Sequence, residues 1–347
     1  MRLIRLAVVD DSAFVRKAIQ KMLAGDARIE VVGTATSGEE LLANLAAWAP
    51  DVITLDLSMA GIGGLVTLDR VMALRPTPVI ILSTHAGRGA PQTIEALHRG
   101  AADFIDKQEY SLLDFSALRE VLVAKVLAVA WSDVSRHGTG TLAPAAPEPA
   151  GGYQVLLIGA STGGPPAIEQ VLQDLGGDCP VPVLVVQHMP QGFTRAFADR
   201  LNSHLPLEVR EAEEGMPLLP GRVYIGPAGR HLRIGRGGER AACTLSLKPE
   251  GLAHRPAVDE LFLSALPDAG RAAAALLTGM GRDGAEGMRQ LAEGGAFTVA
   301  QDEATSIVYG MPGAAVNLQA VREVLPLRRI GPRLREVLAE SRTAAAG

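Results

Sequence analysis

The sequence predicts an α/β protein with two domains, and three features support this fold class. Apolar runs alternate with amphipathic segments through the first 125 residues, the pattern of βα units around a parallel sheet. A second series of apolar runs begins at Val155, and a stretch rich in alanine, proline and glycine separates the two series. The length of 347 residues also suits two domains. We expect an N-terminal domain over 1–125, a linker over 131–152 and a C-terminal domain over 153–347.

The composition excludes several classes of protein. Hydrophobic residues make up 48% of the chain and charged residues 20%, which is ample for two cores. No apolar run approaches the roughly 20 residues of a membrane span, and no signal peptide begins the chain. The two cysteines form no CxxC pair, which argues against a disulfide scaffold or a zinc site. A net charge of −5 favours no nucleic acid partner. We expect a cytoplasmic protein.

The N-terminal half is predicted to be a doubly wound (βα)5 domain. Strands are expected at residues 3–9, 52–57 and 79–82, and helices at 15–23 and 65–74. Polar residues follow the strands, where a parallel sheet places its ligands: Asp10, Asp11, Asp56, Ser83 and Lys107. Three carboxylates at one edge repel one another unless a cation neutralises them, and all-oxygen ligation suits Mg²⁺. The alternative is that these acids are helix caps in solvated loops.

On these residues, 1–125 resembles a two-component response regulator receiver domain. The resemblance implies that Asp56 is the phosphoacceptor and that Asp10 and Asp11 join it in holding Mg²⁺. It also implies that Ser83 is the switch hydroxyl and that Lys107 bonds the acyl phosphate. The phosphodonor would be a chemotaxis histidine kinase.

Two positions depart from the receiver pattern. Ala60 and Gln108 stand where the family commonly has proline. The proline after the lysine is usually preceded by a cis peptide bond, which a non-proline residue adopts only at a cost of about 2.5–4 kcal/mol. We therefore expect the loop of Lys107 to differ in geometry from the family.

The C-terminal half is predicted to be a second, more irregular α/β domain. A helix over 112–130 leads into the linker, and further elements follow Val155. Strands are expected at 181–187, 273–278 and 297–301, with shorter strands and turns over 209–247. Helices are expected after Gly164, at 194–205 and 257–266, from about 283, and at 334–338.

Three side chains stand at expected strand ends in this half. Ser161 lies in a G-x-S-x-G turn between a strand and a helix, His188 follows the strand over 181–187, and Asp283 follows the strand over 273–278. If those strands are neighbours, a hydroxyl, an imidazole and a carboxylate meet at one edge, as acyl transfer requires. The chain order differs from that of α/β-hydrolases, so that fold is not expected.

Other interpretations of these residues stay open at this point. Ser161 can be a capping serine in a tight turn, His188 a structural histidine, and Asp283 a helix N-cap. His204 lies late in a helix and is expected to be solvated. The remaining histidines sit in polar turns and are candidates for lining a cleft: His231 and His254.

Four motifs make 153–342 resemble the catalytic domain of the chemotaxis protein-glutamate methylesterase family, which also deamidates receptor glutamines. They are Gly159-Ala-Ser161-Thr-Gly-Gly164, Gln187-His188-Met-Pro190, His254-Arg-Pro-Ala-Val-Asp259 and Leu277-Thr-Gly-Met280-Gly-Arg-Asp283. The resemblance implies that Ser161 is the nucleophile, His188 the general base and Asp283 the orienting acid. Met280 would supply an oxyanion N–H beside Thr162, and no metal would be needed in this site.

We therefore expect a phosphorylation-regulated hydrolase that demethylates glutamyl esters of methyl-accepting chemotaxis receptors, and that also deamidates them. The chain would act as a monomer without inserting into the membrane. Arg195, Arg230 and His254 are candidates for lining a cleft shaped for the receptor. The alternative is a receiver that controls a non-catalytic binding module, and methanol release from methylated receptor would separate the two.

Overall fold

A computed structural model describes residues 2–83, 89–107, 115–130, 153–235 and 241–344. These residues form two compact units, one over 2–130 and one over 153–344, and each is described by itself. The expected linker over 131–152 lies outside the described residues. Among the described helices, none combines the length and the apolar character needed to cross a membrane.

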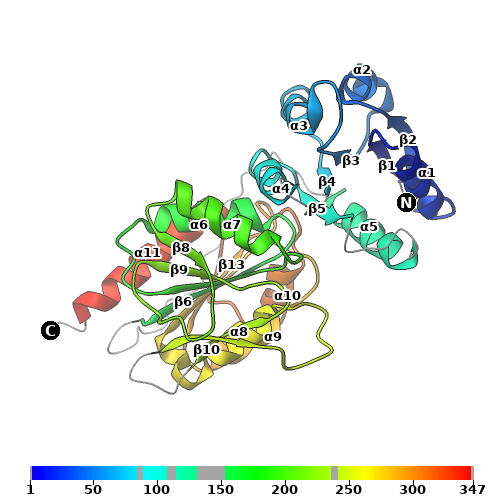
Figure 1. Cartoon of the computed structure of the whole chain (residues 1–347). Helices are drawn as coiled ribbons and strands as arrows, with labels where there is room; N and C mark the ends of the chain where they lie inside the picture. Colours follow the sequence, from blue (N-terminus) through cyan, green and yellow to red (C-terminus); the bar gives the residue numbers. More distant parts are fainter. Residues whose placement is uncertain (1, 84–88, 108–114, 131–152, 236–240, 345–347) are drawn as a thin grey trace. The chain divides into compact units, whose positions relative to one another are not determined.

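The N-terminal unit is built on a five-stranded parallel sheet in the order β2-β1-β3-β4-β5 (Figure 1). Its strands are β1 (Ile4–Val9), β2 (Ile29–Ala35), β3 (Val52–Asp56), β4 (Val79–Ser83) and β5 (Asp103–Asp106). On one face α1 (Ala13–Leu23) packs against α5 (Phe115–Val129), and α2 (Gly38–Trp48), α3 (Gly63–Leu74) and α4 (Gly89–His98) cover the other. The expected doubly wound (βα)5 fold is confirmed.

The sequence patterns missed three elements of this unit: β2, α2 and α4. Strand β2 lies at the edge of the sheet and buries only Ile29 and Ala35, so it has no continuous apolar run. Helix α2 did have a local start signal, because Ser37 accepts a hydrogen bond from the N–H of Glu40, as an N-cap does.

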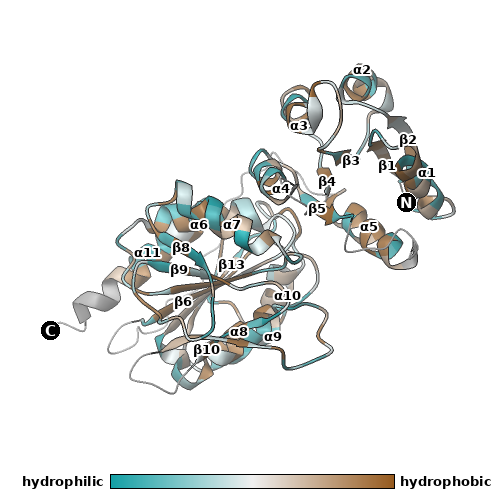
Figure 2. Ribbon diagram, in the orientation of Figure 1, coloured by the Kyte–Doolittle hydropathy of each residue, from teal (hydrophilic) through white to brown (hydrophobic). Residues whose placement is uncertain are grey.

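The C-terminal unit contains a seven-stranded sheet in the order β14-β13-β12-β6-β7-β9-β8, in which every pairing is parallel. Its strands are β6 (Val155–Ala160), β7 (Val183–Gln187), β8 (Glu208–Glu211), β9 (Arg222–Ile225), β12 (Ala272–Leu276), β13 (Phe297–Gln301) and β14 (Glu323–Leu325). A separate antiparallel hairpin joins β10 (His231–Gly235) to β11 (Ala242–Ser246). Most strands of the seven-stranded sheet correspond to apolar runs of the sequence, and Figure 2 colours them mostly as hydrophobic. Such runs are typical of strands that helices cover on both faces.

Helices cover both faces of this sheet (Figure 1). One face carries α6 (Gly164–Leu175), α7 (Phe193–His204) and α11 (Leu327–Ala344); the other carries α8 (Val258–Ser264), α9 (Ala285–Glu293) and α10 (Met311–Asn317). A 3-10 helix, η1 (Leu266–Arg271), continues from α8. Helix α11 is far longer than the expected 334–338, because buried Ile330, Leu334 and Val337 keep a helical spacing across Pro332.

The sheet order places three strand ends side by side. Strand β6 lies between β7 and β12, with Ala160 opposite Gln187 and Gly159 opposite Leu276. The loops that leave these three strands therefore meet at one edge. The pattern of polar and apolar residues along the chain could not predict this order of strands. Strand order depends on contacts between segments more than 20 residues apart.

Candidate active site

Ser161 directly follows β6 and precedes the turn into α6. Gly163 has a φ of +77°, which favours glycine, and helix α6 begins at the next residue. The N–H of Ser161 donates to the carbonyl of Thr278 at 3.0 Å, so the backbone of the serine is tied to the loop after β12. The hydroxyl of Ser161 forms no hydrogen bond with another described residue and is available for chemistry.

His188 directly follows β7, and its two ring nitrogens have different surroundings. Nε2 lies 2.8 Å from Oδ2 of Asp283, whereas Nδ1 is buried and has no hydrogen-bond partner within the described part of the chain. The ring of His254 stacks on that of His188, with centroids 3.9 Å apart and an interplanar angle of 18°. The imidazole is therefore held at one nitrogen and on one face, and its other nitrogen can accept a proton.

Asp283 lies at the start of α9 in the chain but does not cap that helix, whose N-cap is Gly284. Its carboxylate instead accepts hydrogen bonds from the N–H groups of Val258, at 2.7 Å, and Asp259, at 2.9 Å. Burial opposes ionisation, but the hydrogen bond to His188 and these amides outweigh it and hold the pKa of Asp283 below its usual value. Asp283 is thus an anion that faces His188.

The loop after β12 brings Met280 to the same edge. A Cβ atom on Gly279 would lie 2.9 Å from Cβ of Ser161, so only glycine lets this loop approach the serine so closely. The N–H of Met280 donates to no other described residue, and its side chain is 38% exposed. Thr162 is buried beside the serine, and its carbonyl accepts the hydroxyl of Thr278 at 2.9 Å.

Two residues of the site escaped the sequence reasoning about roles. Gln187 is buried, and its Nε2 donates to the carbonyls of Ser161, at 2.9 Å, and His188, at 3.1 Å. Asp259 donates its backbone N–H to Asp283. Gln187 and Asp259 both lie within the sequence motifs described above. Their positions, at the end of a strand and in the first turn of a helix, do not indicate which distant residues they bond.

The other histidines and arginines are placed differently from one another. His231 is fully buried in β10, where Nδ1 accepts the N–H of Ala257 and Nε2 bonds the carbonyl of Pro249. The expectation that His231 lines a cleft from a polar turn is therefore wrong, and burial lowers its pKa. Arg195 pairs with Asp199 at 3.4 Å, and His204 ends α7 in an exposed position, as expected. Arg230 is also exposed.

The acidic residues of the N-terminal unit meet at the carboxyl edge of its sheet. One carboxylate oxygen from each of Asp10, Asp11 and Asp56 lies within 4.8 Å of the other two. Nζ of Lys107 lies 2.7 Å from Oδ2 of Asp10 and 3.3 Å from Oδ1 of Asp56. Burial first, partly offset by Lys107 and then reinforced by Asp10, raises the pKa of Asp56. Hard oxygen donors with excess negative charge fit a divalent cation such as Mg²⁺.

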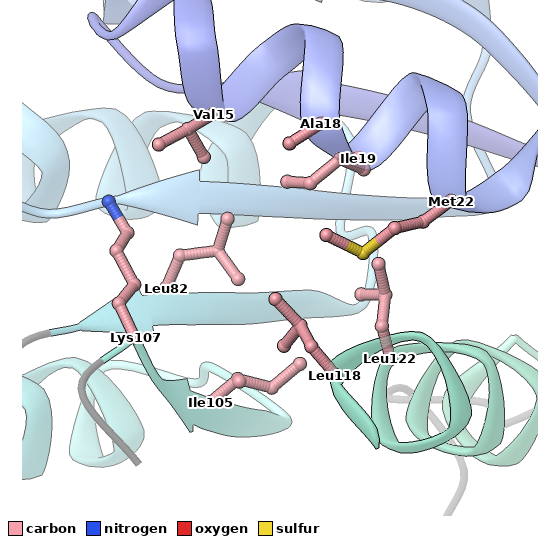
Figure 3. Close-up of a pocket in the computed structure, with 9 residues that line it drawn as sticks. All are labelled: Val15, Ala18, Ile19, Met22, Leu82, Ile105, Lys107, Leu118 and Leu122. Atoms are coloured by element: carbon pink, nitrogen blue, oxygen red, sulfur yellow. The ribbon is translucent and has the colours of Figure 1, made fainter. Parts of the chain in front are cut away.

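Lys107 also lines an apolar cavity between α1, α5 and the sheet, whose volume is about 30 Å³. Figure 3 shows its side chain at the edge of the group of apolar side chains, with the amine at the end away from α5. The cavity is lined mainly by Val15, Ala18, Ile19, Met22, Leu82, Ile105, Leu118 and Leu122. The Ser83 hydroxyl lies against that of Thr93 in α4. Gln108, on which the expected change of loop geometry depends, lies outside the described residues.

Two known families match the two halves of the chain. The family described as CheB methylesterase matches residues 156–334, and the family described as response regulator receiver domain matches residues 6–115.

Individual proteins are similar over nearly the whole chain. The chain is 42% identical to a protein-glutamate methylesterase/protein-glutamine glutaminase 1 of Xanthomonas euvesicatoria and 43% identical to a protein-glutamate methylesterase/protein-glutamine glutaminase of Symbiobacterium thermophilum, each over 98% of both chains. The crystal structure of the Thermotoga maritima CheB methylesterase catalytic domain matches with a TM-score of 0.52 and 36% identity, covering 53% of this chain and 98% of that one.

Proposed function

Because the chain belongs to the CheB methylesterase family and joins that domain to a response regulator receiver domain, we propose that it hydrolyses glutamate γ-methyl esters on methyl-accepting chemotaxis receptors. The single observation that carries the chemistry is the state of His188. One nitrogen is bonded to Asp283 and the other is buried without a partner among the described residues. His188 follows β7, which pairs with β6, the strand that Ser161 follows.

In the proposed reaction, Ser161 Oγ attacks the γ-carbonyl carbon of the ester while Nδ1 of His188 takes the hydroxyl proton. The carbonyl oxygen becomes an oxyanion that the N–H of Met280 stabilises beside Thr162. The intermediate collapses, and the C–O bond to the methoxy group breaks. The methoxy oxygen takes the proton from His188 and leaves as methanol.

The second half of the reaction restores the enzyme. Water attacks the acyl-serine and gives a proton to Nδ1 of His188. The ester to Ser161 then breaks, glutamate is released, and the serine oxygen regains its proton. Throughout, Asp283 keeps the imidazole oriented and stabilises its charged form, as its hydrogen bonds and lowered pKa favour. A glutamine side chain would follow the same route with ammonia as the leaving group, so deamidation belongs to the proposal.

The receiver domain is proposed to regulate this hydrolase. Asp56 would accept a phosphoryl group from a chemotaxis histidine kinase, and Mg²⁺, held by Asp10, Asp11 and Asp56, would neutralise charge between the phosphoryl oxygens and these acids. Lys107 is already within bonding distance of two of the acids, so its ammonium can follow the new negative charge at Asp56. The hydroxyl of Ser83 is the proposed switch group at the neighbouring strand end.

The test is methanol release from receptor membranes carrying radiolabelled methyl esters. The intact protein should release methanol. Ser161→Ala removes the nucleophile and His188→Ala removes its base, so each should lower kcat by about 10⁴-fold or more. Ser203→Ala, which removes an exposed serine of α7, is the matched control and should keep full activity. A Ser161→Ala protein that keeps a tenth of the rate would exclude a mechanism in which Ser161 is the nucleophile, and an intact protein that releases no methanol would support the binding-module alternative.

A further inference from the structure

We propose that Asp259 is a positioning residue that holds Asp283, and through it His188, by reciprocal hydrogen bonds between the starts of α8 and α9. The carboxylate of Asp283 accepts backbone N–H groups at the start of α8, the helix that contains Asp259. The carboxylate of Asp259 accepts a backbone N–H at the start of α9, the helix that follows Asp283. The inference rests on the proposed roles of His188 and Asp283 and adds a residue to them.

The first half of this arrangement runs from Asp283 to α8. The carboxylate of Asp283 accepts the N–H groups of the first two residues of α8, Val258 and Asp259. These N–H groups have no partner within their own helix, so an external carboxylate satisfies them and meets the positive end of the helix dipole. Oδ2 of Asp283 forms hydrogen bonds both with the N–H of Val258 and with Nε2 of His188. The position of α8 therefore sets the orientation of the carboxylate toward the imidazole.

The second half runs back from Asp259 to α9. Oδ1 of Asp259 accepts the N–H of Gly287, in the first turn of α9, at 2.7 Å. Asp283 is separated from α9 only by the N-cap Gly284, so this bond helps to fix the segment that carries Asp283. Together the two carboxylates tie α8 to α9 at the point where the imidazole is bound.

Two glycines make this close contact possible. Gly284 has a φ of +87°, and a Cβ atom on it would lie 2.5 Å from Cγ1 of Val258. A Cβ atom on Gly287 would lie 2.8 Å from Cβ of Phe262 and 3.1 Å from Oδ1 of Asp259. Larger residues would push α9 away from α8 and lengthen the bonds to Asp259.

The charge at Asp259 is unfavourable for the fold by itself. Burial first, opposed by the hydrogen bond from Gly287 and reinforced by the nearby charge of Asp283, raises its pKa to about 6. A partly buried carboxylate beside a second one destabilises the folded domain. We therefore infer that its hydrogen bonds serve another purpose. Holding Asp283 in a fixed orientation is such a purpose, because a displacement of about 1 Å at a catalytic group can cost about a hundredfold in rate.

The experiment compares Asp259→Ala and Asp259→Asn in the full-length protein, with methanol release from methylated receptor as the assay. Asp259→Ala loses the bond to the N–H of Gly287 in α9, and we expect kcat to fall by about ten- to a hundredfold with KM changed by less than about twofold. Asp259→Asn keeps an oxygen that can accept the N–H of Gly287, and it should recover most of the rate. Asn202→Ala, which removes a side-chain acceptor from the N–H of Val209 in a different part of the domain, should keep the parent kcat.

A second readout separates positioning from stability. The low-field proton NMR signal of the His188 Nε2–H bond to Asp283 should shift upfield or broaden in Asp259→Ala and persist in Asp259→Asn. If Asp259→Ala does not fold, Asp259→Ser removes the same bond with a shorter polar side chain and should behave alike. Parent kcat and an unchanged signal in the variant that lacks this bond would overturn the inference. If the parent protein released no methanol, the proposed function itself would fail instead.

Discussion

His188 carries the chemistry at the scale of single residues, because its two nitrogens are in unequal environments. The Asp283 carboxylate accepts a hydrogen bond from Nε2–H, which leaves the lone pair on Nδ1 directed away from the acid. His254 covers one face of the ring at 3.9 Å. An imidazole held in this way needs little reorganisation when it takes the proton of Ser161.

Asp259 gives a prediction about pH and stability. Its pKa is raised from 3.8 to about 6, so the folded state binds the proton more tightly than the unfolded state does. Its contribution to stability is fully present below about pH 3.8 and is lost as the pH rises through about 6. We therefore expect the melting temperature of Asp259→Asn to gain on that of the parent as the pH rises from 4 to 7. Calorimetry at several pH values measures this difference.

The matched control is Asp178→Asn, because Asp178 has a side chain that is 75% exposed. The difference in melting temperature between this variant and the parent should vary little over the same pH range. A pH-independent difference for Asp259→Asn as well would mean that the Asp259 carboxylate titrates as an exposed one does.

At the scale of elements, the site depends on how the ends of β6 and β7 are fastened together. The side chain of Gln187 spans the two strand ends by donating to the carbonyls of Ser161 and His188. Gly164, the first residue of α6, leaves room for it, because a Cβ atom there would lie 1.9 Å from Oε1 of Gln187. The amide thus fixes the spacing between the proposed nucleophile and the proposed base.

Replacing this amide should uncouple the two strand ends. In Gln187→Leu the carbonyl of His188 loses its hydrogen-bond donor, and the carbonyl of Ser161 loses one of its two donors. Each buried hydrogen bond that is lost lowers the free energy of unfolding by about 1–3 kcal/mol. We expect kcat to fall by about tenfold or more with a modest loss of melting temperature. Methanol release and calorimetry measure the two effects. Gln290→Leu, in which an α9 side chain loses its bond to Glu286, is the control. Equal kcat in both variants would contradict a positioning role for Gln187.

At the scale of the whole molecule, the chain joins a hydrolase to a domain whose acid cluster suits phosphorylation. Phosphorylation of Asp56 would add about −1.5 to −2 charges beside Asp10 and Asp11. The cluster already contains more negative charge than Lys107 can balance, and the pKa of Asp56 is raised, first by burial. We therefore expect that a divalent cation has to bind before a phosphoryl group can be accommodated there.

This requirement predicts how the intact enzyme responds to a small phosphodonor. Acetyl phosphate with Mg²⁺ should change the rate of methanol release by the parent protein. Asp56→Asn should keep the basal rate and lose the response, because it lacks the phosphoacceptor. Asp69→Asn, a change on the exposed surface of α3, should respond as the parent does. Replacing Mg²⁺ with a chelator should abolish the response and leave the basal rate unchanged. A response that survives in Asp56→Asn would place regulation elsewhere.

Local patterns were sufficient to predict most of the fold. The apolar runs before Asp10, Asp56, Ser161 and His188 all became strands, and the small-residue turn after Ser161 became the start of α6. Such patterns depend on neighbours within a few residues, where burial and backbone freedom decide the conformation. The edge strand β2 lacked that local signal because it is partly exposed, and the helical spacing of α11 was missed because Pro332 lies inside it.

The sequence by itself determined the two-domain α/β organisation, the serine turn and the residue types at the strand ends. Only the tertiary structure decided that β6 lies between β7 and β12, that Nε2 rather than Nδ1 of His188 faces Asp283, and that Asp259 bonds back to α9. It also placed His231 inside the core and bonded Asp283 to the start of α8. The hydrogen bonds among these features join residues 24 to 95 positions apart. They depend on helix and strand packing, which local patterns do not encode.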